Sequence, residues 1–583
     1  MCSLRLPRPR LQQRLRQPPA DLVALNRASA TTRTRTAVTT SMLHRRRATA
    51  VAVATVLALL AAGCTSASDQ ASTSSSAGAS GETSSGAATS GSSAASGSSA
   101  TPGAPGSGTA ASGINWTSCG ERLSCAEVSV PLDWSDPDGE QITLAVIRQS
   151  ASKPDQRIGT MFLDPGGPGD TGVGLIRGGG ADIDTWGDGR FDLIAWDPRG
   201  THASSPVKCF TSDAEAAAFW EGVAIPSTPA ESAAYATRMK DVAQRCGEMM
   251  GPLLSNISTT DTVRDMDRLR ELNGDETITY AGLSYGSMIG QIYANMFPDR
   301  VRAMMLDGIV YPPDYTTSAE TRSSADAANT DQVFNQFLTL CDQAGPDKCA
   351  LAGHGEPAAA RVARLFAQVQ AAPIPAPNAS PPDELRYSDL KISSFSPMRD
   401  PRTWPQYAAD LNAAVDGDVT ALVTAAQSSR LPASYDEATK SSAISCLDGP
   451  ATKTVDDWPT VIGNLDASSV MSGSVQGWWL WAPCSANWPA KSDDRYTGPW
   501  DAKTKEPILL IGTRYDPNTG YRNAVRSQLL LGNAVLLTHQ GYGHLSFNDP
   551  SACIEQARTS YLVDLQVPAP GTVCDADQQP FNY

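Results

Sequence analysis

Residues 277–296 read TITYAGLSYGSMIGQIYANM, and this stretch decides the fold. The β-branched and aromatic residues 277–281 predict a buried strand, and residues 287–296 predict a helix. Gly282-Leu283-Ser284-Tyr285-Gly286 lies between them. Glycines on both sides of Ser284 allow a sharp turn without side-chain clashes, which leaves the serine exposed at the turn. A strand, a GxSxG turn and a helix in this order are typical of a nucleophile elbow.

Two later segments supply the partners that a serine nucleophile needs. Asp516 follows one apolar run, and a second apolar run leads to His539 and, after a glycine-rich turn, to His544. A serine hydroxyl becomes a good nucleophile when a neutral imidazole takes its proton and a carboxylate holds that imidazole in the useful tautomer. We therefore predict Ser284, Asp516 and His544 as catalytic residues and His539 as a structural histidine. The alternative for Asp516 is a turn or helix-capping residue, in a loop that Thr519 also caps.

A glycine-rich loop upstream completes the set. Residues 159–164 predict a strand that leads into Pro165-Gly166-Gly167-Pro168-Gly169. Such a loop lets backbone N–H groups face the oxyanion of a tetrahedral intermediate. We predict Gly166 or Gly167 as one donor and Tyr285, the residue after the nucleophile, as the other. The alternative is an ordinary turn.

The order of the expected elements is typical of an α/β protein. Strand-like runs alternate with helical stretches such as 261–272, a pattern that produces a mostly parallel sheet with helices on both faces. The order Ser, Asp, His along the chain is that of α/β-hydrolases. The strand candidates are 126–131, 142–149, 159–164, 191–197, 277–282, 301–307, 507–513 and 533–538.

The chain between Asp307 and Pro507 is too long for a loop. We therefore expect a large inserted cap over 312–500, which divides the hydrolase core into 114–311 and 501–583. Four tryptophans of the cap either line a substrate pocket or belong to its core: Trp478, Trp479, Trp481 and Trp488.

The N-terminal region has the features of an export signal. His44-Arg45-Arg46-Arg47 precedes an uncharged apolar run that ends in small residues before Cys64. The run is too short to span a bilayer comfortably, and small residues before a cysteine resemble a bacterial lipoprotein signal. We expect a signal region over 1–64, with Met42 as an alternative start, and lipidation of Cys64; simple secretion is the alternative. Residues 65–113, nearly all Ser, Ala, Gly and Thr, then form a flexible linker.

Charge is distributed unevenly along the chain. The net charge is -15, but residues 1–64 carry 11 Arg and one Asp, so the remainder has 35 basic and 60 acidic side chains. An acidic body without a basic cluster argues against nucleic acid and anionic membrane surfaces as partners. A membrane contact would come only through a lipid on Cys64. The sequence has no HExxH and no CxxC motif and its five histidines are scattered, so we expect no metal and no other cofactor.

Ten cysteines lie in the expected globular part, and an even number in an exported protein indicates disulfides. Pairing in sequence order closes short loops throughout; free buried thiols are the alternative. The predicted pairs are Cys119–Cys125, Cys209–Cys246, Cys341–Cys349, Cys446–Cys484 and Cys553–Cys574.

Several motifs together resemble one family. They are Pro165–Gly169, Trp196–Gly200, Gly282–Ser287, Leu306–Gly308 and Ile444–Asp448, with Tyr293-Ala294, Phe297-Pro298, Cys484 and Trp488-Pro489. The combination resembles exported tripeptidyl-aminopeptidase-type serine hydrolases of the α/β-hydrolase fold, relatives of prolyl aminopeptidases, over nearly all of 114–583. The resemblance implies a triad on Ser284, Asp516 and His544 and the release of short peptides or single residues from free N-termini. His202 departs from the family, which has a glycine there, and this departure bears on substrate preference.

We therefore predict an exported, lipid-anchored serine peptidase that forms an acyl-enzyme on peptides with free N-termini. An α-ammonium group in a partly desolvated pocket needs a carboxylate partner. We expect that partner in the cap, with Asp448 as the candidate. Two alternatives stay open: a carboxylesterase or lipase with the same machinery, and a non-catalytic envelope binding protein on the same scaffold.

Overall fold

The computed structural model describes residues 113–221, 225–430, 435–485 and 487–583. The predicted signal region, Cys64 and the predicted linker up to residue 112 lie outside the described residues.

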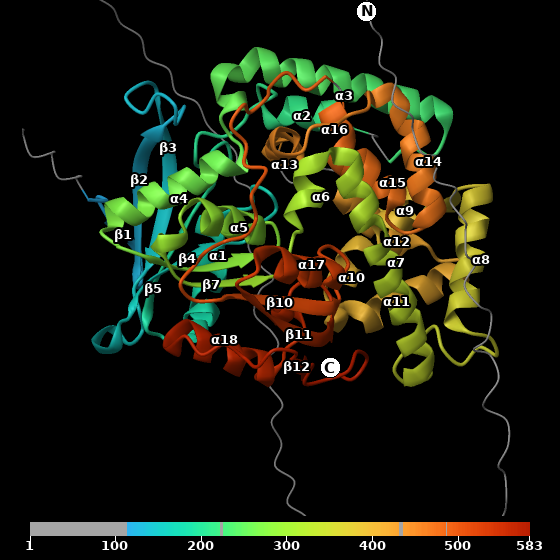
Figure 1. The fold of residues 1–583 in the computed structure, drawn as a ribbon. Coiled ribbons are helices and arrows are strands. Elements are labelled where there is room, and N and C mark those ends of the chain that lie inside the picture. The colour runs from blue at the N-terminus through green and yellow to red at the C-terminus, as the bar shows by residue number, and fades with distance from the viewer. Residues whose placement is uncertain (1–112, 222–224, 431–434, 486) are drawn as a thin grey trace, which may run out of the picture. The chain divides into compact units, whose positions relative to one another are not determined.

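A ten-stranded sheet runs through the described part of the chain, in the order β1-β2-β3-β5-β4-β6-β7-β10-β11-β12 (Figure 1). The strands from β5 to β12 in this order are parallel, and β1, β2 and β3 form an antiparallel extension at one edge. This topology confirms the predicted mostly parallel α/β-hydrolase sheet. The bounds are β1 Thr117–Gly120, β2 Leu123–Pro131, β3 Gln141–Gln149, β4 Gly159–Asp164, β5 Phe191–Trp196, β6 Ile278–Leu283, β7 Val301–Asp307, β10 Ile508–Tyr515, β11 Ala534–Tyr542 and β12 Val573–Asp575.

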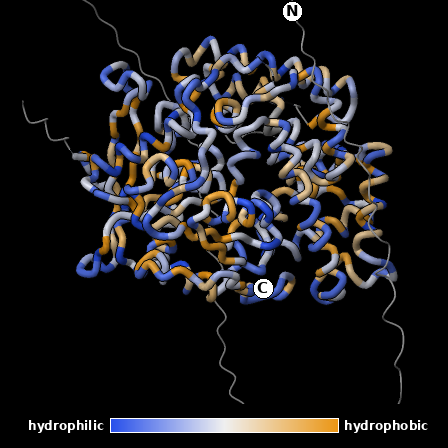
Figure 2. Tube along the Cα trace, in the orientation of Figure 1, coloured by the Kyte–Doolittle hydropathy of each residue, from blue (hydrophilic) through white to orange (hydrophobic). Residues whose placement is uncertain are grey.

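Helices cover both faces of the sheet because successive residues of a strand point to opposite sides. Phe162, Tyr280 and Leu306 share one apolar cluster with α4 (Thr259–Asn273) and α5 (Gly286–Met296). The neighbouring residues Leu163, Ala281 and Met305 share another with α1 (Gly172–Asp184) and α18 (Ala552–Asp564). In Figure 1, α4 and α5 lie above the sheet and α18 lies below it. Figure 2 shows hydrophobic stretches gathered along the strands and hydrophilic ones at the periphery.

Between β7 and β10 the chain forms a mainly helical region. Part of it encloses its own apolar cluster, in which Phe337, Leu365 and Trp404 pack together. Tyr542 and Phe581 of the C-terminal segment join that cluster, so apolar packing ties this region to the sheet. Its elements are α6 Pro312–Thr317, α7 Ala319–Ala344, α8 Ala358–Ala371, β8 Ile374–Ala376, β9 Asp383–Leu385, α9 Tyr387–Ile392, α10 Phe395–Arg399, α11 Trp404–Val415, α12 Thr420–Arg430, α13 Tyr435–Asp448, α14 Trp458–Ser468, α15 Gly473–Val475 and α16 Ala482–Ser485.

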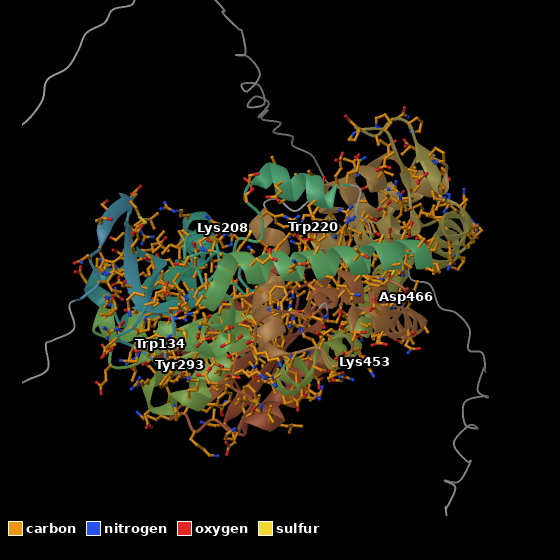
Figure 3. The ribbon with its side chains drawn as sticks, turned by 90° about the horizontal axis from the view of Figure 1, so that it is seen from above. Trp134, Lys208, Trp220, Tyr293, Lys453 and Asp466 are labelled. Atoms are coloured by element: carbon orange, nitrogen blue, oxygen red, sulfur yellow. A yellow bond between two sulfur atoms is a disulfide. The ribbon has the colours of Figure 1, made fainter. Side chains whose placement is uncertain are left out.

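The long helix α3 (Pro229–Met250) precedes this region in the chain but packs on it. The rings of Tyr235 and Trp478 lie 5.3 Å apart, and the Tyr235 hydroxyl donates to the Trp478 carbonyl at 3.0 Å. Seen from above, α3 crosses the view, with Trp220 of α2 (Asp213–Trp220) beside it and Asp466 near one of its ends (Figure 3). The remaining helix, α17, spans Tyr521–Leu531 and packs on β10 and β11.

The Asp-Pro-Arg-Gly motif after β5 has a structural role. Arg199 has no exposed surface and bonds to both carboxylate oxygens of Asp265 in α4. Its other N–H groups donate to the carbonyls of Pro131, Leu132 and Asn256. Because every partner of this buried cation is an anion or a carbonyl, Arg199 holds the end of β2 against α4.

Candidate active site

Ser284 lies at the turn between β6 and α5, with a left-handed φ of 53°. A β-carbon at Gly282 would lie 2.4 Å from the Gly286 carbonyl oxygen, and one at Gly286 would lie 2.5 Å from the Asp164 carbonyl oxygen. Both positions therefore require glycine, because the turn brings backbone against backbone. The Ser284 N–H donates to the Asp307 carbonyl at 2.8 Å, which ties the turn to the end of β7.

His544 and Asp516 meet Ser284 in the order that acyl transfer needs. His544 Nε2 lies 2.9 Å from Ser284 Oγ, and His544 Nδ1 lies 3.0 Å from both carboxylate oxygens of Asp516. His544 and Asp516 are 1 % and 2 % exposed, so their hydrogen bond is shielded from water. The structure thus brings together the three residues that the sequence predicted.

The loop after β10 fixes the Asp516 carboxylate. The N–H groups of Asn518 and Thr519 donate to Asp516 Oδ1 at 2.8 and 2.9 Å, and the Thr519 hydroxyl donates to Oδ2 at 2.8 Å. Burial alone raises the pKa of Asp516, but the charge of His544 and the bonds from His544 and Thr519 bring that pKa below its ordinary value. Asp516 therefore stabilises its own turn and also orients His544. The sequence analysis gave these two roles, turn residue and triad member, as alternatives, and the structure shows contacts for both.

A second carboxylate supports the loop that carries His544. Asp307, at the end of β7, accepts from the Ser546 N–H at 3.1 Å and from the Ser546 hydroxyl at 2.6 Å. The His544 N–H donates to the Arg399 carbonyl at 2.9 Å. The sequence analysis did not identify Asp307 as a functional residue, because Leu306-Asp307-Gly308 appeared there only among the motifs that resemble the family.

Two other described histidines, His539 and His354, bond to residues outside the triad. His539 Nδ1 lies 3.2 Å from the Thr513 hydroxyl, and burial lowers the pKa of His539 to about 4. His354 bonds to the Ala350 carbonyl on the surface. These contacts favour structural roles for both side chains.

The glycine-rich loop lies directly beside the nucleophile. Gly167 lines the cavity at Ser284 together with Tyr285. The N–H of Gly166 points elsewhere and donates to Asp164 Oδ1 at 2.9 Å. Of the two loop candidates, Gly167 is therefore the one whose N–H is left to pair with that of Tyr285 around an oxyanion.

The expectation for Asp448 is corrected by the structure. Asp448 is 4 % exposed and is not among the residues that line the cavity. Its carboxylate accepts from the N–H and hydroxyl of Thr259 and from the Tyr285 hydroxyl, and burial raises its pKa to about 6. Because Thr259 and Tyr285 already donate to its carboxylate, Asp448 holds these two residues together, and it does not line the cavity at Ser284.

A cavity of about 170 Å³ opens beside Ser284. Two acidic side chains line it, Asp314 and Asp326. Asp314 is paired with Arg526. Asp326 accepts from Asn523 Nδ2 at 3.4 Å, and burial raises its pKa to about 6, against the opposing field of Arg322. The other lining residues are Gly167, Pro168, Tyr285, Val310, Tyr311, Tyr315, Arg322, Ser441, Ser442, Ser445, Gln476, Asn518, Thr519 and Asn523.

The tryptophans proposed for the pocket lie elsewhere where they are described. Trp478 is buried against Tyr235, and Trp488 packs against the same apolar cluster. The side chains of Trp479 and Trp481 lie outside the described residues. The core alternative therefore holds for Trp478 and Trp488.

His202 also stands outside the cavity lining, but it contacts the helix that forms one wall. Its Nε2 lies 2.9 Å from the Lys440 ammonium in α13. The next residue, Ser441, donates to the Pro168 carbonyl of the glycine-rich loop at 2.8 Å. The residue that departs from the family at position 202 therefore contacts α13, the helix that is also bonded to the glycine-rich loop.

The ten cysteines of the globular part are joined in the five pairs expected from sequence order. Cys446–Cys484 connects α13 to α16 and so braces the wall of the cavity that carries Ser441 and Ser445. Among the described residues, no group of three or more His, Cys, Asp or Glu side chains is placed to hold a metal ion. In the same part of the chain no helix is long and apolar enough to cross a membrane.

A serine at an elbow, a histidine and a buried aspartate in this geometry define a serine hydrolase of the α/β-hydrolase fold. Comparison with known proteins agrees. A family described as "alpha/beta hydrolase fold" matches residues 165–344, and one described as "TAP-like protein" matches residues 471–574.

Curated relatives extend the similarity over most of the chain. Carboxylesterase B of Mycobacterium tuberculosis is 30% identical over 490 residues, which cover 81% of this chain and 91% of that protein. Serine protease Hip1 of the same species is 29% identical over 494 residues, which cover 79% and 91%. Tripeptidyl aminopeptidase of Streptomyces lividans is 26% identical over 493 residues, which cover 80% and 87%. This chain belongs to the tripeptidyl-aminopeptidase-type (TAP-like) α/β-hydrolases.

Proposed function

We propose that this serine hydrolase is an exported peptidase that releases short peptides or single residues from free N-termini through an acyl-enzyme. The observation that carries the proposal is the pair of carboxylates, Asp314 and Asp326, in the cavity at Ser284. A substrate with a free N-terminus brings a cation into that cavity, and a carboxylate is the group that stabilises it there. The relatives named tripeptidyl aminopeptidase and serine protease support the same substrate class.

In the proposed mechanism Ser284 Oγ attacks the carbonyl carbon of the scissile bond while His544 Nε2 takes its proton. Asp516 holds Nδ1–H and stabilises the imidazolium that forms. The N–H groups of Gly167 and Tyr285 donate to the oxyanion of the tetrahedral intermediate. His544 then protonates the leaving amine, and a water molecule, activated by the same imidazole, releases the acyl group.

We propose Asp326 as the partner of the substrate ammonium, in place of Asp448. Asp314 is ion-paired with Arg526, whereas Asp326 accepts a hydrogen bond from the neutral amide of Asn523 and lies in the field of Arg322, which also lines the cavity. Burial raises the pKa of Asp326 to about 6 despite the field of Arg322, so the surroundings do not fully compensate its negative charge, and a substrate ammonium would stabilise that charge further.

Acetylating the N-terminus of a good peptide substrate is expected to lower kcat/KM by about 10²-fold or more, the effect of losing a buried charge pair worth about 3 kcal/mol. Asp326→Asn is expected to reduce the ratio of kcat/KM for free over acetylated peptide by at least about tenfold. Asp347→Asn, which removes the same charge from an exposed position, should leave that ratio unchanged.

Steady-state kinetics on matched free, acetylated and ester substrates measure these ratios. Equal kcat/KM values for free and acetylated peptides, or a higher kcat/KM for simple p-nitrophenyl esters than for both peptides, would contradict the aminopeptidase proposal. That outcome would favour the second candidate, a carboxylesterase, which the relative named carboxylesterase B supports.

We also propose that the protein is exported and lipid-anchored through Cys64. The five disulfides support an oxidising compartment. Cells grown with an alkyne fatty acid are expected to label the wild-type protein and the Cys2→Ser control, because only the cysteine after the small residues is a lipidation site. Cys64→Ser should abolish the label; a Cys64→Ser protein that is still labelled contradicts the anchor.

A further inference from the structure

A second buried carboxyl group lies under the glycine-rich loop and takes no part in the triad. Asp164 is the last residue of β4 and has no exposed surface. Its Oδ1 accepts the Gly166 N–H at 2.9 Å, while its Oδ2 has no hydrogen-bond partner among the described residues. A β-carbon at Gly286 would lie only 2.9 Å from Oδ1, so the carboxyl group packs against the first residue of α5.

Among the described residues, no cation acts on Asp164 to compensate its charge. The titratable groups that interact with it electrostatically are Asp170 on the same loop, Tyr280 of β6 and Tyr285 at the start of α5. None of them is a cation, and burial raises the pKas of both tyrosines, so they stay neutral. Burial, with Asp170 adding to it, raises the pKa of Asp164 to about 8, against the opposing bond from Gly166. At neutral pH the group is therefore mainly the uncharged acid.

We propose that Asp164 is a positioning residue of the oxyanion site that works as a neutral carboxylic acid. By accepting the Gly166 N–H it fixes the loop so that the following N–H, that of Gly167, is turned to the oxyanion. Its neutrality matters because the oxyanion forms at the N-terminus of α5, where the helix dipole stabilises one negative charge. A second negative charge packed against that helix end would oppose the first.

The proposal rests on the acyl-transfer chemistry of Ser284 and not on the identity of the substrate. A p-nitrophenyl ester therefore tests it whether the enzyme is a peptidase or an esterase. Labelling of Ser284 by a fluorophosphonate probe, measured in parallel, reports separately whether the proposed nucleophile is correct.

The pH profile of kcat is the readout that a merely structural role would not move. In the wild-type enzyme kcat should fall as pH rises through about 8, because ionised Asp164 then faces the oxyanion site. Asp164→Asn keeps an amide oxygen for the Gly166 N–H but does not ionise. It is expected to retain kcat within about fivefold at pH 7 and to lose this alkaline fall, so that its kcat exceeds that of the wild type above pH 9.

Two further variants complete the test. Asp164→Ala removes the acceptor, and its kcat should drop by about 10²-fold at pH 7 with a smaller change in KM, similar to the loss of one oxyanion donor. Asp170→Asn removes an exposed charge from the same loop and leaves Asp164 in place. Its kcat should still fall at alkaline pH, but the fall should occur at a slightly lower pH than in the wild type, because the charge of Asp170 no longer raises the pKa of Asp164.

Thermal unfolding shows whether each variant is folded and supplies a second measurement. The pKa of Asp164 is about 8 in the folded protein and 3.8 at its ordinary value in the unfolded chain. Asp164 therefore lowers the free energy of unfolding as pH rises from 3.8 toward 8. The difference in Tm between Asp164→Asn and the wild type should therefore shift in favour of the variant as pH rises from about 5 to 8. An Asp164→Asn enzyme that keeps the wild-type alkaline fall, or that is folded but loses kcat a hundredfold at pH 7, would overturn the proposal.

Discussion

Replacing Ser284 by alanine is expected to lower kcat/KM by at least about 10⁴-fold while the fold survives. The hydroxyl at 2.9 Å from His544 Nε2 is the proposed nucleophile, and the alanine substitution removes it. The backbone bond from residue 284 to the Asp307 carbonyl does not depend on the side chain. Alanine and serine also tolerate the φ of 53° equally well, so the Tm should change little.

Peptide and ester assays, together with fluorophosphonate labelling, measure the effect. The probe should label the wild-type protein and the Ser324→Ala control, whose serine is exposed on α7, but not Ser284→Ala. Retention of more than about a tenth of the wild-type activity by Ser284→Ala would show that the nucleophile is another residue. Failure of the wild type to react would favour the non-catalytic alternative.

The strands that carry the site were predictable because each is a short, continuous apolar run. Strands of a parallel sheet are covered on both faces, so nearly every residue in them is apolar. Gly, Pro or Asp residues at either end of the apolar run mark where each strand begins and ends. The predicted 159–164 and 301–307 match β4 and β7, and the other predicted strands differ from the structure by a few residues at their ends. β1 and β12 escaped prediction because short edge strands bury little and carry no apolar pattern.

Asp516 and His544 were found for a related reason. In an α/β sheet the functional side chains sit just beyond the carboxyl ends of the strands, so the first suitable residues after each strand are the candidates. Local order along the chain was therefore enough to identify them.

The partner of a buried carboxylate does not show in local sequence. Asp448 lies in a motif that suggested a binding role, but its donors come from Thr259 and Tyr285, 189 and 163 residues away. The sequence did not indicate a binding role for Asp326 because it lies within α7, and an acidic residue in a helix usually belongs to the solvent-exposed face. Its place in the cavity lining depends on how α7 packs in the folded chain, where Asp326 meets Asn523 of α17.

The choice between Gly166 and Gly167 was likewise beyond sequence reasoning. Both glycines have left-handed backbones, with φ of 102° and 105°, and both suit a close approach to the nucleophile. The decision depends on which N–H the Asp164 carboxyl group takes, and that is a property of how the end of β4 packs against α5.

Replacing His544 by alanine is expected to reduce kcat/KM by about 10⁴-fold or more, because the proton of Ser284 then has no acceptor and the carboxylate of Asp516 has no imidazole to orient. His539→Ala is the matched control, since it removes an equally buried ring from the same strand and loop region. We expect it to keep kcat/KM within about tenfold, because its ring bonds to Thr513 and not to the triad.

The cost of His539→Ala should appear in stability instead. Removing a fully buried ring leaves a cavity, which lowers the free energy of unfolding by about 2–4 kcal/mol. Because burial holds the folded pKa of His539 near 4, below its ordinary value of 6.5, the unfolded chain takes up the proton first as pH falls. His539 thus makes the wild-type protein less stable between pH 6.5 and 4, and His539→Ala should show a weaker loss of Tm over that range. Kinetics and thermal unfolding of the two variants separate the roles. If His539→Ala were the inactive protein and His544→Ala merely the less stable one, the general base would be His539.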